Sequence, residues 1–272
     1  MKLSFWTLGT PGWSNQAVVE AAKRFGYQGV DLRCAANGNI SVQSTAEEIT
    51  GLRDLFGAYE IEIASLLAYN ERGNDDGVDW DAVVADLVAH AALCVRLGTE
   101  NLRVNVGAPA RDSTWDAYLE GFAGAVTKAL SMVEGVTMNT QNHPGSITAA
   151  QAGRLAEMVG SSHFGIGFSP DHCVDMGEDP VVLASQVGHL VRHLHLADRE
   201  APDGAMVDGK LRACLPGEGM VPNGRVLEVL RSKGFDEWVS FKWEKPTYPD
   251  LPDAEEALPK FVAFMSTLQL VR

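Results

Sequence analysis

Short runs of apolar residues alternate along the chain with longer segments whose apolar positions recur at helical spacing. The runs with strand character cover residues 3–8, 28–33, 60–67, 101–106, 136–140, 164–168, 191–196 and 237–242. Between such runs, segments such as 84–95 and 258–268 place apolar side chains at i, i+3 and i+4, which is typical of helices that bury one face. The alternation predicts about eight βα units around a parallel sheet.

Such βα units close most simply as a (β/α)8 barrel, or TIM barrel, and a chain of 272 residues has the length of one such barrel. We therefore expect a single domain over residues 1–272. An open, doubly wound sheet is the alternative that periodicity alone leaves open. Gly26 is expected to end a helix, and Ser14 and Ser146 are expected to cap the helices that follow them.

Composition narrows the class of protein. Hydrophobic residues make up 46% of the chain and charged residues 21%, as in ordinary globular proteins. The formal net charge of -14 repels phosphate backbones, so no nucleic-acid partner is expected. Four scattered cysteines without a C-x-x-C spacing suit a reducing cytoplasm. The apolar runs predict neither a leader peptide nor a membrane span, so a cytoplasmic protein is expected.

Polar residues gather where the later strands are expected to end. They form the strings NTQNHPG (139–145), SPDH (169–172), HLADR (195–199) and SFKWE (240–244). Side chains alternate along a strand, so His193 and His195 share a face, as do Lys242 and Glu244. Any one of these residues could make an ordinary structural contact, but the active sites of barrels are built from several strand ends. The convergence of four strand ends therefore favours a functional site.

Five strings follow one another in the order of the strand-end motifs of the xylose-isomerase-like barrels: QNHPG, SPDHCVDMGE, HLHLADR, LPGEGMVPNGRVLEVLRSKGFD and WVSFKWEKP. The chain resembles that group, which includes sugar phosphate isomerases and epimerases, ketose 3-epimerases and inosose dehydratases. The likeness starts at LSFWTLGTPGW and covers nearly the whole chain. It implies a (β/α)8 fold, a homo-oligomer, and proton transfer next to a carbonyl group that a divalent metal polarises.

The positions that hold the metal in this group are mostly changed here. The group's motifs resemble E-N-H-P-G, D-P-x-H, H-x-H-x-x-D and S-x-E-W-E. Gln141, Ser169 and Lys242 stand at three of the ligand positions, and His195 matches the fourth. These replacements remove negative charge and add an ammonium group, which repels a divalent cation. We therefore expect no cofactor, and a displaced divalent metal at His172 and His195 is the alternative.

The expected site residues follow from this pattern. Lys242, His172 and His195 are the catalytic candidates. A lysine near the metal position could stabilise an enolate, act as a base or form a Schiff base, and histidines transfer protons near neutral pH. The substrate-binding candidates are the polar and aromatic side chains around them: Trp6, Gln141, His143, Ser169, Asp198, Arg199 and Glu244.

The sequence therefore predicts an isomerase, an epimerase or a lyase that acts on a small sugar, polyol or keto acid without the group's metal. The alternative is a non-catalytic barrel that binds a small carbohydrate-like ligand or a protein partner, because relaxation of a metal site would also leave Gln, Ser and Lys at these positions. An apurinic endonuclease of related fold is disfavoured, since it needs several zinc ligands and a cationic groove for DNA.

Overall fold

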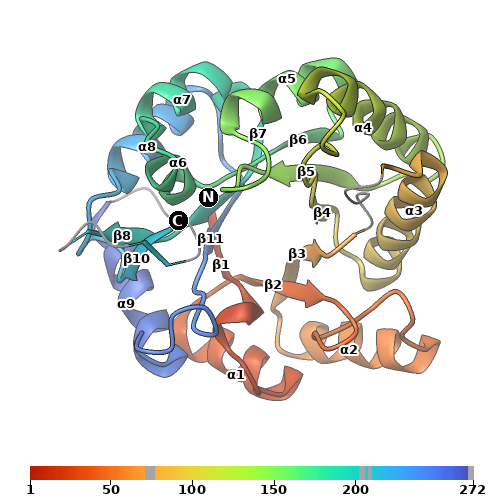
Figure 1. Cartoon of the computed structure of the whole chain (residues 1–272). Helices are drawn as coiled ribbons and strands as arrows, with labels where there is room; N and C mark the ends of the chain where they lie inside the picture. Colours follow the sequence, from red (N-terminus) through yellow and green to blue (C-terminus); the bar gives the residue numbers. More distant parts are fainter. Residues whose placement is uncertain (71–76, 202–205, 208–209, 269–272) are drawn as a thin grey trace.

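Eight parallel strands surround a central axis, and helices cover them on the outside (Figure 1). The computed structural model describes residues 1–70, 77–201, 206–207 and 210–268. The strands follow the order β1-β11-β7-β6-β5-β4-β3-β2 and form a nearly closed (β/α)8 barrel. The prediction of a TIM barrel is therefore confirmed, and the chain is not an open, doubly wound sheet.

The predicted strands are all present, with ends shifted by a few residues. The barrel strands are β1 (Lys2–Phe5), β2 (Gly29–Cys34), β3 (Glu62–Ala68), β4 (Asn101–Val104), β5 (Thr137–Gln141), β6 (Phe164–Phe168), β7 (Val191–Leu196) and β11 (Trp238–Phe241). The helices are α1 (Asn15–Phe25), α2 (Ala46–Ala58), α3 (Trp80–Leu97), α4 (Trp115–Leu130), α5 (Ala149–Val159), α6 (Pro170–Asp175), α7 (Pro180–Val187), α8 (Asn223–Ser232) and α9 (Ala254–Thr267). Short 3-10 helices occur at η1 (Thr7–Gly9) and η2 (Gly188–Leu190).

The barrel closes at a seam between β1 and β2. Within the described chain the pairing there is an isolated parallel bridge between Trp6 and Asp31. The backbone N–H of Arg33 also donates a hydrogen bond of 2.9 Å to Oγ1 of Thr7, which holds the segment after β1 against β2. The seam thus places Trp6 at the end of β1 next to a buried carboxylate of β2.

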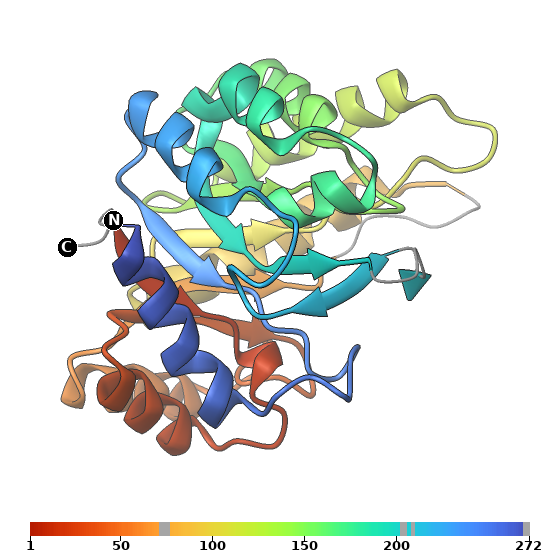
Figure 2. The same ribbon diagram turned by 90° about the vertical axis from the view of Figure 1, so that its left-hand side faces the viewer.

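A small antiparallel sheet follows β7, and sequence patterning did not predict it. β8 (Asp198–Glu200) and β9 (Met206–Val207) both pair with β10 (Lys210–Cys214). Figure 2 shows this sheet at the end of the barrel toward which the strand arrows point, whereas the N-terminus lies at the opposite end. Its strands are too short to show an alternating apolar pattern, which is why the sequence does not reveal them.

Local capping fixes the helix ends. Ser14 caps α1 through its side chain, and Gly26 ends that helix with a left-handed φ of 84°, as predicted. The prediction for Ser146 is wrong, because the N-cap of α5 is Thr148. Thr148 forms a capping box with Gln151, and this motif satisfies two backbone N–H groups at once.

Apolar side chains between the strands and helices form one core cluster, which includes the fully buried Phe5, Leu66, Phe122, Phe168 and Phe261. A second set of fully buried side chains on the barrel strands is polar: Ser4, Asp31, Asn139, His193, His195 and Ser240. Buried polar groups require partners, and several members of this second set belong to the candidate site described below. Among the described helices, none combines the length and the apolar character that crossing a membrane requires.

Candidate functional site

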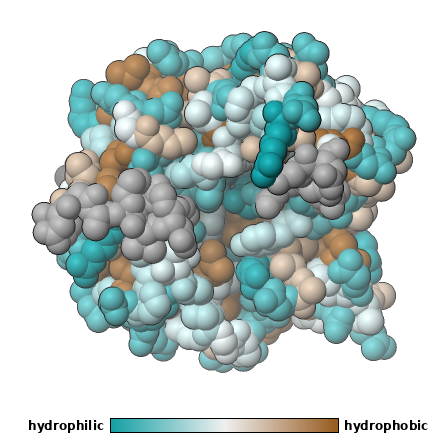
Figure 3. Space-filling model, viewed as in Figure 1, coloured by the Kyte–Doolittle hydropathy of each residue, from teal (hydrophilic) through white to brown (hydrophobic). Residues whose placement is uncertain are grey.

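A pocket of about 510 Å³ lies at the C-terminal ends of the strands. The space-filling view of this end of the barrel is hollowed near its middle (Figure 3). The pocket is lined by five of the residues predicted from sequence: Trp6, Gln141, His143, His172 and Glu244. These side chains come from β5, α6 and the segments that follow the strands. The structure thus brings together residues that lie far apart in the sequence.

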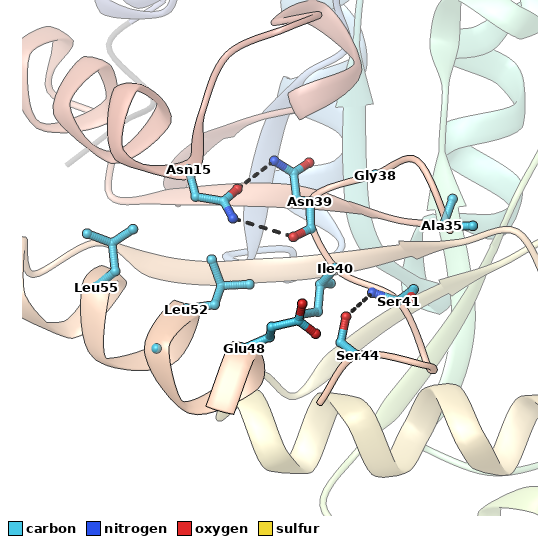
Figure 4. Close-up of a pocket in the computed structure, with 12 residues that line it drawn as sticks. Asn15, Ala35, Gly38, Asn39, Ile40, Ser41, Ser44, Glu48, Leu52 and Leu55 are labelled. Carbon is cyan, nitrogen blue, oxygen red and sulfur yellow. Dashed lines mark hydrogen bonds between the residues drawn. The ribbon is translucent and has the colours of Figure 1, made fainter. Parts of the chain in front are cut away.

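A second pocket, of about 440 Å³, lies beside the segment after β2 and α2 (Figure 4). Asn15 and Asn39 hydrogen-bond to each other there, and the backbone N–H of Ser41 donates to Ser44. Oε2 of Glu48 accepts a hydrogen bond of 2.7 Å from the backbone N–H of residue 45. These polar groups satisfy one another. The active sites of barrels lie at the C-terminal ends of the strands, so the candidate site is the pocket there.

Lys242 lies in a buried cluster of charges beneath the strand-end pocket. Its Nζ atom lies 2.6 Å from Oδ2 of Asp171 and 2.7 Å from Nε2 of His172. The Lys242 side chain is 0% exposed, whereas His172 lines the pocket. An ammonium group therefore sits where the resemblance placed a metal ligand, one side chain removed from the pocket.

Both ring nitrogens of His172 are engaged. Nδ1 lies 2.7 Å from the backbone oxygen of Asn142, and because a carbonyl only accepts, Nδ1 carries a proton. Nε2 faces Nζ of Lys242, so one proton is shared between an imidazole and an amine. The two groups therefore interact directly, and the protonation of one affects the other.

Arg199 belongs to the same buried cluster. Its NH2 atom lies 2.6 Å from Oδ2 of Asp171, and its Nε atom lies 3.2 Å from Oδ2 of Asp175. Burial raises the pKa of Asp175 above its usual value, and Arg199 opposes this increase. Arg199 is 1% exposed and does not line the pocket. The structure therefore places this predicted substrate contact among carboxylates beneath the pocket.

Gln141 is held at both ends of its amide. Oε1 accepts hydrogen bonds of 3.2 and 2.8 Å from Nε and NH2 of Arg103. Nε2 donates a hydrogen bond of 2.6 Å to Oγ of Ser169, which lies behind it and is fully buried. The oxygen and nitrogen of the amide are therefore fixed in orientation.

The pocket-lining residues that sequence reasoning missed include Tyr69, Arg103 and Asn105. Arg103 was detectable, because a charged residue between the apolar Leu102 and Val104 of a strand needs a buried partner. Tyr69 is 49% exposed, and its ring packs 5.3 Å from the guanidinium of Arg33. No motif marked Tyr69 or Asn105, since each simply follows a strand.

Trp6 determines the protonation pattern of His195. Its Nε1 atom lies 2.9 Å from Nδ1 of His195. Because an indole N–H can only donate, Nδ1 accepts, and the neutral ring carries its proton on Nε2. Burial and the adjacent His193 lower the pKa of His195 well below its usual value. The geometry makes His195 a neutral hydrogen-bond donor through Nε2, rather than the proton acceptor expected near neutral pH.

Asp31 was also missed as a site-supporting residue. Its Oδ1 atom lies 3.0 Å from Nε2 of His193, and Oδ2 accepts a hydrogen bond from Ser240. The His193 ring stacks on His195 with centroids 4.7 Å apart. The shared face of the two histidines, expected from strand alternation, is therefore found, and Asp31 supports it from β2.

Asp198 is placed away from the pocket. Its carboxylate accepts four backbone hydrogen bonds of 2.8, 2.8, 3.1 and 3.0 Å, from Arg199, Gly217, Gly219 and Val221. These bonds fold the segment between β10 and α8. A carboxylate so fully occupied orders a loop, and Asp198 does not line the pocket.

The donor set does not fit a divalent metal. Among the described residues, Asp171, His172 and Asp175 place potential ligand atoms within 4.8 Å of one another. However, Lys242 and Arg199 each place a nitrogen 2.6 Å from Oδ2 of Asp171. A divalent cation bound here would meet two positive groups at contact distance. The displaced site at His172 and His195 is also disfavoured, because Nε2 of His172 faces an ammonium and Nδ1 of His195 accepts from an indole.

Residues 19–266 match the family described as xylose isomerase-like TIM barrel. The chain therefore belongs to that family. The resemblance of the strand-end motifs is thereby confirmed.

Individual relatives are distant. An inosose dehydratase of Lacticaseibacillus casei is 23% identical over 146 residues, which cover 49% of this chain and 48% of that protein. The chain thus aligns with about half the length of the curated relatives it matches. Among solved structures, the IOLI protein with a binding zinc atom has a TM-score of 0.78, 19% identity and 98% coverage of both chains. A D-tagatose 3-epimerase-like protein has a TM-score of 0.75 and 18% identity, with 100% of this chain and 98% of that one covered. At such identities the solved structures establish the fold alone.

Proposed function

We propose that this barrel is an isomerase, an epimerase or a lyase acting on a small sugar, polyol or keto acid, and that it works without a divalent metal. The observation that carries the proposal is the position of Lys242, whose Nζ lies 2.6 Å from Asp171 and 2.7 Å from His172 beneath a polar pocket. The printed names of the relatives, a dehydratase and an epimerase-like protein, support the same range of reactions.

Removing a proton next to a carbonyl group places negative charge on the carbonyl oxygen, and this charge needs a fixed positive partner. Arg103 lines the pocket and Lys242 lies beneath it. Both positive groups are buried, where their fields are screened less than in water. In the proposed enzyme these two cations stabilise the developing enolate.

Proton abstraction needs a base that reaches the pocket. Glu244 lines the pocket and its side chain is 11% exposed, so it is our candidate base. His172 lines the pocket and is hydrogen-bonded to Lys242, so it is our candidate acid for a departing hydroxyl group, which a dehydration requires. The amide of Gln141 and the ring of His143 orient the substrate hydroxyls.

A specific observation also favours the non-catalytic binding barrel. The Lys242 side chain is 0% exposed, and both ends of the Gln141 amide are held by Arg103 and Ser169. A pocket whose polar groups already have hydrogen-bond partners within the protein can bind a ligand without transforming it. The two functions differ in whether a bound compound exchanges a proton.

The test is deuterium exchange followed by proton NMR in heavy water, with ketoses, inososes and 2-keto acids as probes. Exchange at the carbon next to the carbonyl reports proton abstraction even when the product is unknown. We expect the wild type to exchange at least one probe, and Lys242→Met to lose about 100-fold or more of that rate. The exposed Lys260→Met is the matched control and should keep the wild-type rate.

A folding defect is separated from a chemical one by a second variant. Lys242→Met with Asp171→Asn removes both charges of the buried pair, so it should keep the circular dichroism and the unfolding midpoint near wild type while losing exchange. Wild-type exchange in Lys242→Met contradicts the proposed mechanism. Binding without exchange, with only the affinity altered in the variant, establishes the binding barrel instead.

A further inference from the structure

One carboxylate oxygen beneath the pocket carries two cations from different parts of the fold. Oδ2 of Asp171, on α6, lies 2.6 Å from Nζ of Lys242 and 2.6 Å from NH2 of Arg199. Lys242 follows β11, whereas Arg199 belongs to the antiparallel sheet that extends the barrel. The carboxylate of Asp171 is therefore held by one cation from the barrel and one cation from the added sheet.

Arg199 is itself held from its other side. Its Nε atom lies 3.2 Å from both oxygens of Asp175. Oδ1 of Asp175 also accepts a hydrogen bond of 2.8 Å from the backbone N–H of Leu211, on β10. The hydroxyl of Tyr248 donates a hydrogen bond of 3.1 Å to the backbone oxygen of Leu211. A continuous chain of contacts thus leads from β10 through Asp175 and Arg199 to Asp171.

From this geometry we infer that Arg199 is a positioning residue for Lys242, acting through Asp171, and not a substrate ligand. The inference rests on the proposed function for its effect on turnover. The guanidinium fixes the carboxylate that orients the ammonium, and it takes part of that carboxylate's charge. Lys242 is thereby held toward His172 without being locked into a one-to-one ion pair.

The alternative role, direct contact with substrate, is opposed by burial. Arg199 is 1% exposed and does not line the pocket. To reach a ligand its guanidinium would leave two buried carboxylates, and stripping a buried carboxylate of its partner is strongly unfavourable. The two carboxylates raise the pKa of Arg199 even though burial alone would lower it. The cation therefore stays charged in the cluster.

The titration of Lys242 reports this arrangement directly. The ionisable groups that interact with it are contributed by several elements: Asp171, His172, Cys173 and Asp175 on α6, His195 on β7 and Arg199 on β8. Removing the Arg199 guanidinium takes away one of the two cations that lie 2.6 Å from Oδ2 of Asp171, so the carboxylate acts more strongly on Lys242. The ammonium should then hold its proton to higher pH.

The experiment compares Arg199→Met and Arg199→Lys with Arg212→Met. Arg212 lies on the same small sheet and forms an exposed ion pair with Glu200. Lysines labelled at Cε are followed by carbon NMR as a function of pH, and the signal of Lys242 is assigned as the one absent from Lys242→Met. We expect its titration midpoint to rise by about one pH unit in Arg199→Met, to move little in Arg199→Lys, and to stay unchanged in Arg212→Met.

Kinetics with an exchanging probe give the second readout. A positioning role predicts that kcat falls by about 100-fold in Arg199→Met while KM stays within about twofold, with partial rescue by Arg199→Lys. A raised KM with unchanged kcat identifies Arg199 as a substrate ligand and overturns the inference. So does a variant that only unfolds earlier while the Lys242 titration and kcat stay wild type.

Two controls keep the outcomes distinct. If Arg199→Met does not fold, Arg199→Met with Asp175→Asn keeps the cluster charge balanced and takes its place. If no probe is turned over, the proposed function fails, and the NMR titration still decides the inference by itself. An unchanged Lys242 midpoint in the folded variant overturns it.

Discussion

The indole N–H of Trp6 donates a hydrogen bond of 2.9 Å to Nδ1 of His195 past the intervening strand β11. This contact links the seam of the barrel to β7, because Trp6 also bridges Asp31 on β2. It assigns the proton of the neutral His195 ring to Nε2. A residue of the first strand thereby decides the chemical character of a histidine on the seventh.

Trp6→Phe removes this donor without removing the aromatic ring. It leaves Nδ1 of His195 buried without its partner, which should cost about 1–3 kcal/mol of unfolding free energy. Urea unfolding measures the loss, and nitrogen NMR of the imidazole should show a mixture of tautomers in place of one. Trp13→Phe, at a partly buried indole, is the control and should preserve the single tautomer. A single tautomer in Trp6→Phe would contradict the assignment.

Acid should destabilise the fold through His195. Its pKa is lowered well below the usual value by burial, whereas in the unfolded chain it titrates near about pH 6.5. Below that pH the unfolded state binds a proton that the folded state does not, so stability falls as the pH falls. One such group contributes up to about 1.4 kcal/mol per pH unit. Asp175, whose pKa is raised, has the opposite sign.

The comparison that isolates this effect is between the wild type and His195→Gln. Urea unfolding between about pH 7 and pH 5 should give a steeper loss of stability in the wild type, because the glutamine does not titrate. Any contribution of Asp175 is common to both proteins. Equal slopes would show that the pKa of His195 is the same in the folded and unfolded states, which would contradict the lowered pKa.

Gly167 lies where β6 passes close to two polar side chains. A Cβ atom there would lie 2.5 Å from Oδ1 of Asn139 and 2.9 Å from Nε2 of His195. Gly167→Ala should therefore destabilise the fold by about 1–3 kcal/mol through overpacking. Gly51→Ala, in the middle of α2, meets no atom within 4 Å and should be stabilising by about 0.5–1 kcal/mol. Chemical unfolding of both variants tests the contrast, and equal effects would be inconsistent with it.

Divalent metals should neither bind stoichiometrically nor stabilise the protein. The reason is the pair of cations that already contact Asp171, each at 2.6 Å. Elemental mass spectrometry after purification without chelator, and thermal unfolding with added Mn, Zn, Co or Mg, measure binding. Chelator treatment should leave any exchange activity intact. One equivalent of metal per chain would refute metal-independence and point to a displaced site at His172.

The strand predictions agree with the structure because barrel strands are covered on both sides and read as apolar runs. The pocket was also partly predictable. Gln141 ends β5, and His143 and Glu244 follow strands. The carboxyl ends of barrel strands meet on one face. The missed residues have a common cause. Arg103 and Asp31 lie inside strands. The sequence spacing of a single polar residue in a strand does not indicate which residue it contacts.

Sequence alone determined the architecture, the face on which the site lies, and the replacement of acidic residues by Gln141, Ser169 and Lys242. Periodicity and residue type are local properties, so the sequence alone shows them. Only the tertiary structure decided the partners. Lys242 contacts His172, and Arg199 contacts Asp171 outside the pocket. Trp6 fixes the tautomer of His195. Contacts between residues far apart in the chain depend on register and on the added sheet, and neither leaves a periodic trace in the sequence.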